Sequence, residues 1–405
     1  MTTIDGDRLL RDLRELAGFG KVGTGVNRTA FMPVEMEARR WLCGKMKSAG
    51  LEAGLDSVGN VLGRDETKSR AVLIGSHSDT VPNGGWLDGA LGVVYGLEIA
   101  RTLRGTLPVG VDVVSFQDEE GTFVPCLGSK SFCEILDRDE ASRAVALDGR
   151  RLADELANAK LPARHFNLDR SRHIAFLEAH IEQGPRLEAA GNTIGVVTGI
   201  VGIRRYRITA TGQGDHAGTT PMSMRKDAGA ALIRIAAALI ENMPRFAGRQ
   251  SVWNIGRIDF LPGAANVVPA KATLFLEFRD PDHGQLMRID EQVHRMVATA
   301  AADSPLPIAI EAMGGVDPIA MDARLQKYLL EAAKARGDSP LAMPSGAGHD
   351  AMVLAPLLPS AMMFIPSIGG RSHDLTENTA DADIVFGCQV MADAAARLCR
   401  EDRPG

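Results

Sequence analysis

The chain has 405 residues, of which 45% are hydrophobic and 24% are charged, and its formal net charge is -6. A chain of this length is more than one compact core usually holds, so we expect two domains. The charge pattern contains no basic stripe, which argues against nucleic acid or an anionic membrane surface as a partner and favours a small molecule.

The cysteines and the first residues bear on the compartment. Five cysteines form no Cys-x-x-Cys pair and leave an odd one over, which argues against both a disulfide framework and a thiolate zinc site. The N-terminal residues mix charges with leucines in the pattern of an amphipathic helix rather than a signal peptide, and no apolar run is long enough to span a membrane. We therefore expect a cytoplasmic protein.

The first elements are predicted from their periodicity and turn residues. An N-terminal helix is followed by a glycine-rich loop and by a second helix over Val34–Ala49, where apolar residues recur at helical spacing. Short strands with turns are predicted at Gly50–Gly54 and Asp56–Gly63.

Two buried strands are predicted at Ala71–Gly75 and Val111–Phe116, with a helix over Gly89–Arg104 between them. This order indicates a β-α-β unit of a parallel sheet, whose strands present functional residues at their carboxyl ends. The chemically active residues that follow the two strands are His77, Asp79, Asp88, Glu119 and Glu120. We expect their side chains to converge at one edge of the sheet.

Two later strands have similar ends. The strand over Ile174–Glu178 is followed by His180 and Gln183, and the strand over Ala361–Ile365 is followed by His373. The intervening segment 137–168 is charged and alanine-rich, which predicts helices over the sheet with no chemistry of their own.

The pattern changes after Gly199. The next residues predict a strand, an alanine-rich helix (Arg225–Asn242), two strands, a helix and a strand, which is the β-α-β-β-α-β order of the ferredoxin-like fold. We therefore predict an α/β catalytic domain, with a mostly parallel sheet between helices, formed by residues 1–199 and 315–405. Residues 200–314 would be an inserted α+β domain.

The residues at the strand ends are of the types that bind a hard or borderline divalent metal ion. Three imidazoles and two carboxylates suit zinc, with manganese, cobalt or nickel as alternatives. The five candidate ligands are His77, Asp88, Glu120, His180 and His373. Because five ligands exceed what one catalytic zinc needs, we predict two ions bridged by Asp88.

Two acidic residues beside these ligands receive other roles. Asp79 lies two residues after His77 and could accept the second N–H of that imidazole, which would fix the nitrogen that faces the metal. Glu119 remains free to take a proton from an attacking water and to give it to the leaving nitrogen. A single histidine at a strand end is more often structural than a ligand, but four such strand ends together favour the metal site.

Seven motifs together resemble one protein family. They are Gly75–Gly85, Leu87–Val93, Asp118–Gly121, His180–Gly184, Gly214–Met222, Asn266–Pro269 and Ser345–Asp350. They resemble the N-carbamoyl-L-amino-acid amidohydrolases and allantoate amidohydrolases, the ureido-cleaving branch of the dinuclear aminoacylase and carboxypeptidase superfamily. The resemblance covers nearly the whole chain.

This resemblance implies a role for each matching residue. One metal ion would be bound by His77, Asp88 and His180, and the other by Asp88, Glu120 and His373. Glu119 would be the general base. The inserted domain would form a homodimer, and Gln183 would contact the substrate amide. The residues of the inserted domain that would act on substrate are His216, Asn266 and Arg279, with His216 reaching the site from the partner subunit.

Some of these roles also have a physical basis. His216 lies in a loop rich in glycine, which could hold its imidazole toward a developing oxyanion. The planar fork of Arg279 suits a substrate carboxylate, although an ion pair with Asp280 or Asp282 is an alternative. The loop that ends at Gly348 could offer backbone N–H groups to an anion or could be a simple turn. We place Gly348 and His349 with the substrate-binding residues.

Two segments depart from the family pattern and leave the substrate open. Thr122–Cys126 replaces the usual Arg-Phe pair after Gly121, and Ser372–Glu377 replaces the usual Ser-His-Ser-Pro-x-Glu. We predict metal-dependent hydrolysis of a linear amide or ureido C–N bond in a small carboxylate-bearing substrate such as an N-carbamoyl-L-amino acid, allantoate or ureidoglycolate. The alternatives are a dipeptidase or N-acyl-amino-acid deacylase, and a metal-binding scaffold without turnover.

Overall fold

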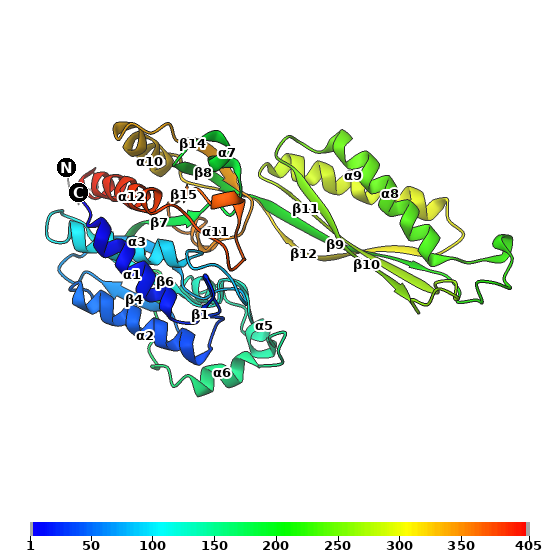
Figure 1. Cartoon of the computed structure of the whole chain (residues 1–405), viewed down its shortest axis with the longest axis horizontal. Helices are drawn as coiled ribbons and strands as arrows, with labels where there is room; N and C mark the ends of the chain where they lie inside the picture. Colours follow the sequence, from blue (N-terminus) through cyan, green and yellow to red (C-terminus); the bar gives the residue numbers. More distant parts are fainter. Residues whose placement is uncertain (1–2, 402–405) are drawn as a thin grey trace. The chain divides into compact units, whose positions relative to one another are not determined.

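The computed structural model describes residues 3–401 and divides into two compact units. One unit takes the chain as far as Thr198 and again from Ala320 onward, and the other spans Gly199–Ile319. These divisions lie one residue and five residues from the boundaries predicted at 199/200 and 314/315. The second unit is thus an insertion in the sequence of the first, as the colours of Figure 1 show.

Within the described residues, the first unit contains a nine-stranded sheet in the order β13-β8-β15-β7-β5-β6-β4-β3, with β14 paired to β8. Its four central strands run parallel to one another. They are β5 (Ala71–His77), β6 (Gly110–Phe116), β7 (His173–Ile181) and β15 (Ser360–Ile365). The predicted α/β class with a mostly parallel sheet is confirmed.

The remaining elements of the sheet lie at its two sides. They are β3 (Glu52–Leu55), β4 (Val61–Arg64), β8 (Gly195–Ile200), β13 (Ile319–Ala320) and β14 (Leu341–Ser345). A separate two-stranded hairpin is formed by β1 (Lys21–Val22) and β2 (Gly25–Val26). The helices of this unit are α1 (Gly6–Gly18), α2 (Pro33–Ser48), α3 (Ala90–Leu103), α4 (Leu127–Phe132), α5 (Arg138–Arg143), α6 (Leu152–Asn158), α7 (Arg186–Ala190), α10 (Ala323–Ala335), α11 (Asp350–Leu354) and α12 (Asp381–Glu401).

Helix α3 connects β5 to β6 and packs closely on the sheet. All residues of β5 and β6 are buried, as expected for parallel strands covered on both faces. A Cβ atom at Gly92 would lie 2.6 Å from the backbone oxygen of Ala179, and one at Gly96 would lie 2.8 Å from that of Ile74. These two glycines therefore allow the close approach of helix and sheet.

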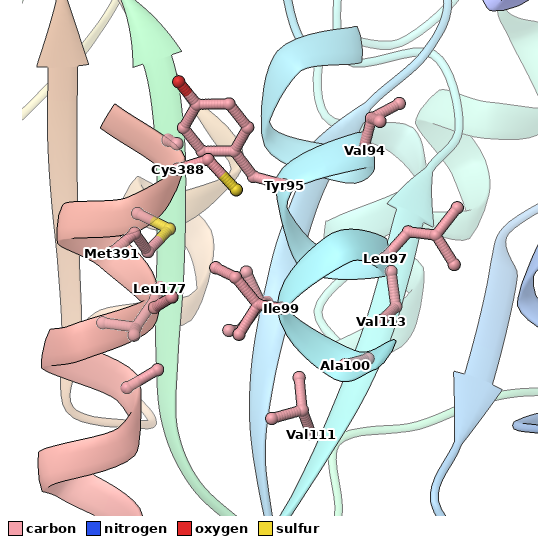
Figure 2. Close-up of a cluster of buried hydrophobic side chains, with 14 of the residues drawn as sticks. Val94, Tyr95, Leu97, Ile99, Ala100, Val111, Val113, Leu177, Cys388 and Met391 are labelled. Atoms are coloured by element: carbon pink, nitrogen blue, oxygen red, sulfur yellow. The ribbon is translucent and has the colours of Figure 1, made fainter. Parts of the chain in front are cut away.

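The core of the first unit lies between the sheet and a layer of packed helices. Helices α1, α3 and α12 contact one another, and Figure 1 shows them together over the sheet. Figure 2 shows Tyr95 and Ile99 of α3 facing Cys388 and Met391 of α12. Cys388 is fully buried and is a residue of this core.

The second unit has the predicted β-α-β-β-α-β order. Its elements are β9 (Gly202–Thr211), α8 (Ala228–Phe246), β10 (Val252–Leu261), β11 (Lys271–Asp280), α9 (His283–Ala302) and β12 (Ile308–Val316). The strands form an antiparallel sheet in the order β10-β11-β9-β12, and both helices contribute to its hydrophobic core. Helix α8 begins later than the predicted Arg225, because the side chain of Asp227 accepts a hydrogen bond from Ala230 N and caps the helix.

Between residues 3 and 401, no helix combines the length and the apolar character needed to cross a membrane.

Candidate metal centre

The carboxyl ends of the parallel strands bring the predicted ligands together. In the register of the sheet, His77 lies beside Phe116 at the end of β6, and His180 lies beside Phe364 of β15. Two groups of potential ligand atoms result, and the atoms of each group lie within 4.8 Å of one another. The first group is His77, Asp88 and His180, and the second is Asp88, Glu120 and His373.

Asp88 belongs to both groups because its two carboxylate oxygens face different histidines. Its Oδ1 lies 3.4 Å from Nε2 of His77 and 3.0 Å from Nε2 of His180. Its Oδ2 lies 3.3 Å from Nε2 of His373. This arrangement is the one that a carboxylate shared by two metal ions requires.

The second ring nitrogens of His77 and His180 fix the orientation of both imidazoles. Nδ1 of His77 lies 3.0 Å from the backbone oxygen of Asp79, and Nδ1 of His180 lies 2.9 Å from that of Ile181. Because a carbonyl oxygen can only accept, each Nδ1 donates and each Nε2 keeps its lone pair for a ligand.

Asp79 therefore orients His77 through its backbone and not through the predicted carboxylate contact. Its Oδ1 lies 3.7 Å from Nδ1 of His77, beyond hydrogen-bonding distance. Its Oδ2 instead accepts a hydrogen bond of 3.3 Å from the backbone N–H of Glu120. The carboxylate thus supports the loop that carries Glu119 and Glu120.

Gly89, which follows Asp88, is required by the local backbone and by space. It has a φ of +64°, and a Cβ atom there would lie 2.4 Å from the ring atoms of His77. Any larger residue would displace the imidazole or strain the backbone. The sequence Asp88-Gly89 thus sets the approach of the shared carboxylate to His77.

Glu377 supports the same region and was not predicted to have a role. Its buried carboxylate accepts hydrogen bonds of 3.1 Å from the N–H groups of both Leu87 and Asp88, and one of 2.9 Å from the hydroxyl of Ser372. It therefore links Asp88 to the residue that precedes His373. Its position in the Ser372–Glu377 motif could have indicated a supporting role for Glu377. The sequence does not reveal, however, that a loop carboxylate is buried.

Glu119 and Glu120 lie side by side with different surroundings. Oε2 of Glu119 lies 3.6 Å from Nε2 of His77, yet Glu119 belongs to neither ligand group. Oε2 of Glu120 lies 3.5 Å from Nε2 of His373, and its Oε1 is buried without a hydrogen-bond partner among the described residues. Glu120 thus belongs to the second ligand group, whereas Glu119 lies outside both groups, with Sγ of Cys126 3.9 Å from its Oε1.

The charged groups at this edge of the sheet shift the pKa values of one another. Burial disfavours the imidazolium of His77, but Glu119 and Asp88 outweigh this effect and raise its pKa well above the ordinary value. Burial, together with Asp88, raises the pKa of Glu120 to about 7. A hydrogen bond to Asp88 raises the pKa of His373 to about 9.

These observations test whether a divalent metal ion fits. The donor set consists of imidazole nitrogens and carboxylate oxygens, one buried carboxylate oxygen of Glu120 lacks a partner, and the carboxylates repel one another in a buried setting. A divalent cation would satisfy each of these groups. The residues therefore fit a metal centre.

Three predicted substrate-binding residues lie in the first unit. The side-chain amide of Gln183 donates to Oδ2 of Asp88 at 2.9 Å and to Ser372 Oγ at 3.2 Å, so it lies at the metal centre. Gly348 is exposed. His349 is 2% exposed, with its ring 4.6 Å from that of His180 and Nε2 2.9 Å from Ser345 Oγ, so it packs behind a ligand.

The predicted residues of the second unit fall into two places. His216 and Asn266 are neighbours, since Ala217 N donates to the backbone oxygen of Asn266 and His216 pairs with Val267 in a β-bridge. Both are exposed, beyond the end of β11 that begins at Lys271. Arg279 lies at the opposite end of β11, so the three residues do not form a single site within the second unit.

Arg279 forms an ion pair with Glu277, at 2.7 Å. Residues two apart in a strand share a face, which places the side chains of Arg279 and Glu277 together. Asp280 is buried on the other face, where it accepts from Ser251 Oγ.

The fold and the donor set are those of a metal-dependent hydrolase of the α/β class. Residues 73–397 match the profile of Peptidase family M20/M25/M40, and the chain belongs to this family.

Individual relatives match almost end to end. The chain is 34% identical to an allantoate amidohydrolase of Escherichia coli, over 91% of this chain and 92% of that one. It is 35% identical to an N-carbamoyl-L-amino acid amidohydrolase of Geobacillus stearothermophilus, over 96% and 97% respectively. Among solved structures, an amidase of the hydantoinase/carbamoylase family from Burkholderia phymatum has 47% identity and a TM-score of 0.91, and 98% of each chain is covered.

Proposed function

We propose that this chain hydrolyses a linear C–N bond of a ureido or amide group in a small substrate that carries a carboxylate. The observation that carries the proposal is the position of Asp88, whose two oxygens face two separate ligand groups, with the free carboxylate of Glu119 beside them. A protein that only stored or sensed metal would not need this additional buried acid.

The substrate class follows from what the relatives' named substrates share. Allantoate and N-carbamoyl amino acids both contain a ureido group next to a carboxylate. Arg279, with its planar fork, is the residue proposed to bind that carboxylate. Gln183, whose amide already donates to Asp88, is proposed to contact the ureido group.

The metal ions, Glu119 and His216 would each have a separate role in the reaction. Bound divalent ions would polarise the scissile carbonyl group and acidify the attacking water. Glu119 would accept the proton of that water and deliver it to the departing nitrogen. His216 would donate to the oxygen on which negative charge develops.

We further propose that two ions bind, with zinc as the first choice and manganese, cobalt or nickel as alternatives. Elemental analysis of protein that was reloaded and then desalted should give two ions per chain, as expected for ligand groups that share Asp88. A single ion per chain at saturation would contradict the shared-carboxylate arrangement.

The experiment that tests the proposed function is a substrate panel with the zinc-loaded and the manganese-loaded protein. It compares N-carbamoyl amino acids, allantoate, ureidoglycolate, N-acyl amino acids and dipeptides. Release of ammonia from the ureido compounds is expected. Turnover of dipeptides or N-acyl amino acids alone would assign the chain to the peptidase or deacylase side of the family instead.

A homodimer through the second unit is proposed from the placement of its residues. Arg279 lies eight positions along β11 from Lys271, which corresponds to about 25 Å at the usual rise of a strand. His216 and Asn266 lie beyond that far end. Because one small substrate cannot reach both ends, Arg279 and His216 would act together only if they came from different subunits.

The second unit also offers a surface for pairing. Strand β10 is at the edge of its sheet, and apolar side chains along it are exposed, including Ile258, Phe260 and Leu261. Ile233 and Ile240 of α8 are exposed as well. An open edge strand with apolar side chains pairs readily with a second copy of itself, so β10 is the proposed contact.

Subunit mixing should test the role of the partner. When Glu119→Gln and His216→Ala chains exchange at random between two-fold dimers, about one site in four should regain both residues and recover turnover. The matched control mixes Glu119→Gln with the Glu119→Gln/His216→Ala double variant, which can form no complete site. If proven exchange restores no activity, His216 does not act across the dimer.

A further inference from the structure

A group of four buried charges lies beneath the metal centre. Arg28, Arg39, Glu35 and Asp79 each have no accessible surface. Arg39 pairs with Glu35 through Nε, and its Nη2 lies 3.6 Å from Oδ1 of Asp79, which is an ion pair without a hydrogen bond. Stability alone does not explain such a group, because replacing a buried ion pair by apolar residues of similar volume is often neutral or stabilising.

Arg39 holds the end of β6 by its backbone. Its Nη1 donates to the carbonyl oxygens of Gly59 and Ser115, both at 3.2 Å, and its Nη2 donates to that of Phe116 at 2.9 Å. Phe116 is the last residue of β6, after which the chain continues to Glu119 and Glu120. The guanidinium thus fixes the point from which the catalytic loop departs.

The same guanidinium faces Asp79, which lies two residues after the end of β5. Asp79 accepts from Glu120 N with one carboxylate oxygen and from Nδ1 of His77 with its backbone oxygen. Arg28 donates to the backbone oxygen of Ser78 at 2.8 Å, and this hydrogen bond holds the residue that precedes Asp79. Arg39 therefore connects β5, β6 and two metal ligands through Asp79.

We propose that Arg39 is a positioning residue of the metal centre, which holds Asp79 and the end of β6 so that His77 and Glu120 keep their geometry. Arg39 lies behind the ligands and would not touch substrate. The proposal deepens the proposed function, since the geometry that it assigns to Arg39 is that of the hydrolytic site.

The contacts of Arg39 require an arginine. Its three nitrogens meet two carboxylates and three carbonyl oxygens in a planar arrangement. A lysine has one ammonium group and could not reach these partners at once. Arg39→Lys should therefore keep the charge and lose most of the positioning.

A matched ion pair exists at the other end of the same sheet. Arg172, just before β7, forms a double hydrogen bond with Asp112 of β6, at 2.7 and 2.8 Å, and also donates to two backbone oxygens. This pair is buried like the pair of Arg39 and Glu35, but it lies at the amino ends of the strands, away from the ligands. It serves as the control for a purely structural role.

The test measures zinc affinity by competition with a chromogenic chelator, which needs no substrate. Glu35→Gln/Arg39→Met and Asp112→Asn/Arg172→Met each remove both charges of a hydrogen-bonded pair, so neither variant leaves one member of that pair as a lone ion. We expect zinc to bind about 10–100-fold more weakly to the Glu35/Arg39 variant, the usual cost of losing a partner that orients ligands, with no change in the Asp112/Arg172 variant. Thermal unfolding of both metal-free variants reports the loss of stability separately.

Two further measurements test Arg39 without the double variant. Arg39→Lys in the otherwise unchanged chain should weaken zinc binding even if the double variant does not fold. Combining it with Asp79→Asn should add less than the sum of the two single losses, since both act through one contact. Unchanged zinc affinity in the Arg39 variants, or an equal loss in the Asp112/Arg172 variant, would overturn the proposal. Absence of turnover in the wild-type protein would instead contradict the proposed function alone.

Discussion

Replacing Glu119 by Gln is expected to lower kcat by about a hundredfold or more, the usual contribution of a general base, while the metal content stays unchanged. Glu119 lies 3.6 Å from Nε2 of His77 and belongs to neither ligand group, so an amide there would remove a proton acceptor and no ligand. Steady-state kinetics on the preferred substrate and elemental analysis of the same sample provide the two readouts.

Glu120→Gln is the matched control, because it makes the same chemical change one residue later. Glu120 faces His373 and Asp88 as a member of the second ligand group. Its replacement should weaken metal binding, and excess metal should restore part of the activity. If Glu119→Gln behaved in the same way, Glu119 would be a ligand rather than the base.

The second large effect is expected for Asp88→Asn, which should weaken the binding of both ions and reduce turnover to background. The two oxygens of Asp88 face His77 and His180 on one side and His373 on the other. An amide presents one oxygen and no charge, so the loss should exceed the roughly 10–100-fold that changes to ligand-orienting partners cost. Chelator competition titrations would measure the affinity for each ion.

His373→Gln provides the comparison, since His373 belongs to one group only. It should weaken one ion and leave the affinity of the other close to that of the wild type. Equal stoichiometry and affinity in the Asp88 and His373 variants would show that Asp88 does not serve both groups.

The parallel sheet and its ligand-bearing strand ends could be predicted because their signals are local. The runs at β5 and β6 are mostly apolar and are buried throughout, which is typical of strands covered on both faces. In a parallel sheet their ends share one edge, which is why His77, Asp88 and His180 could be grouped from the sequence alone.

The supporting contacts could not be predicted, because they depend on which atom of a residue reaches a partner. Spacing placed Asp79 near His77 but could not distinguish its backbone oxygen from its carboxylate. Glu377 meets the backbone of Asp88 across almost three hundred positions of sequence, and no local pattern reports such a contact. The ion pair of Arg279 with Glu277 could have been predicted, since alternation along the strand places residues two apart on one face.

The insertion of the second unit imposes an order on the synthesis of the protein. Strand β7 pairs with β5 on one side and with β15 on the other, and β15 is made only after the whole of Gly199–Ile319. Until then β7 has an open, apolar edge in the middle of the future sheet, the kind of edge that invites aggregation and slow, long-range pairing. We expect the inserted unit to form first as the chain emerges from the ribosome, with the first unit closing around β15 last. The pairing of β7 with β15 also spans a long stretch of sequence in the full-length chain, so it should be slow in refolding as well. Pulsed hydrogen exchange during refolding should protect the amides of β9 and β11 before those of β15, and the reverse order would contradict this expectation.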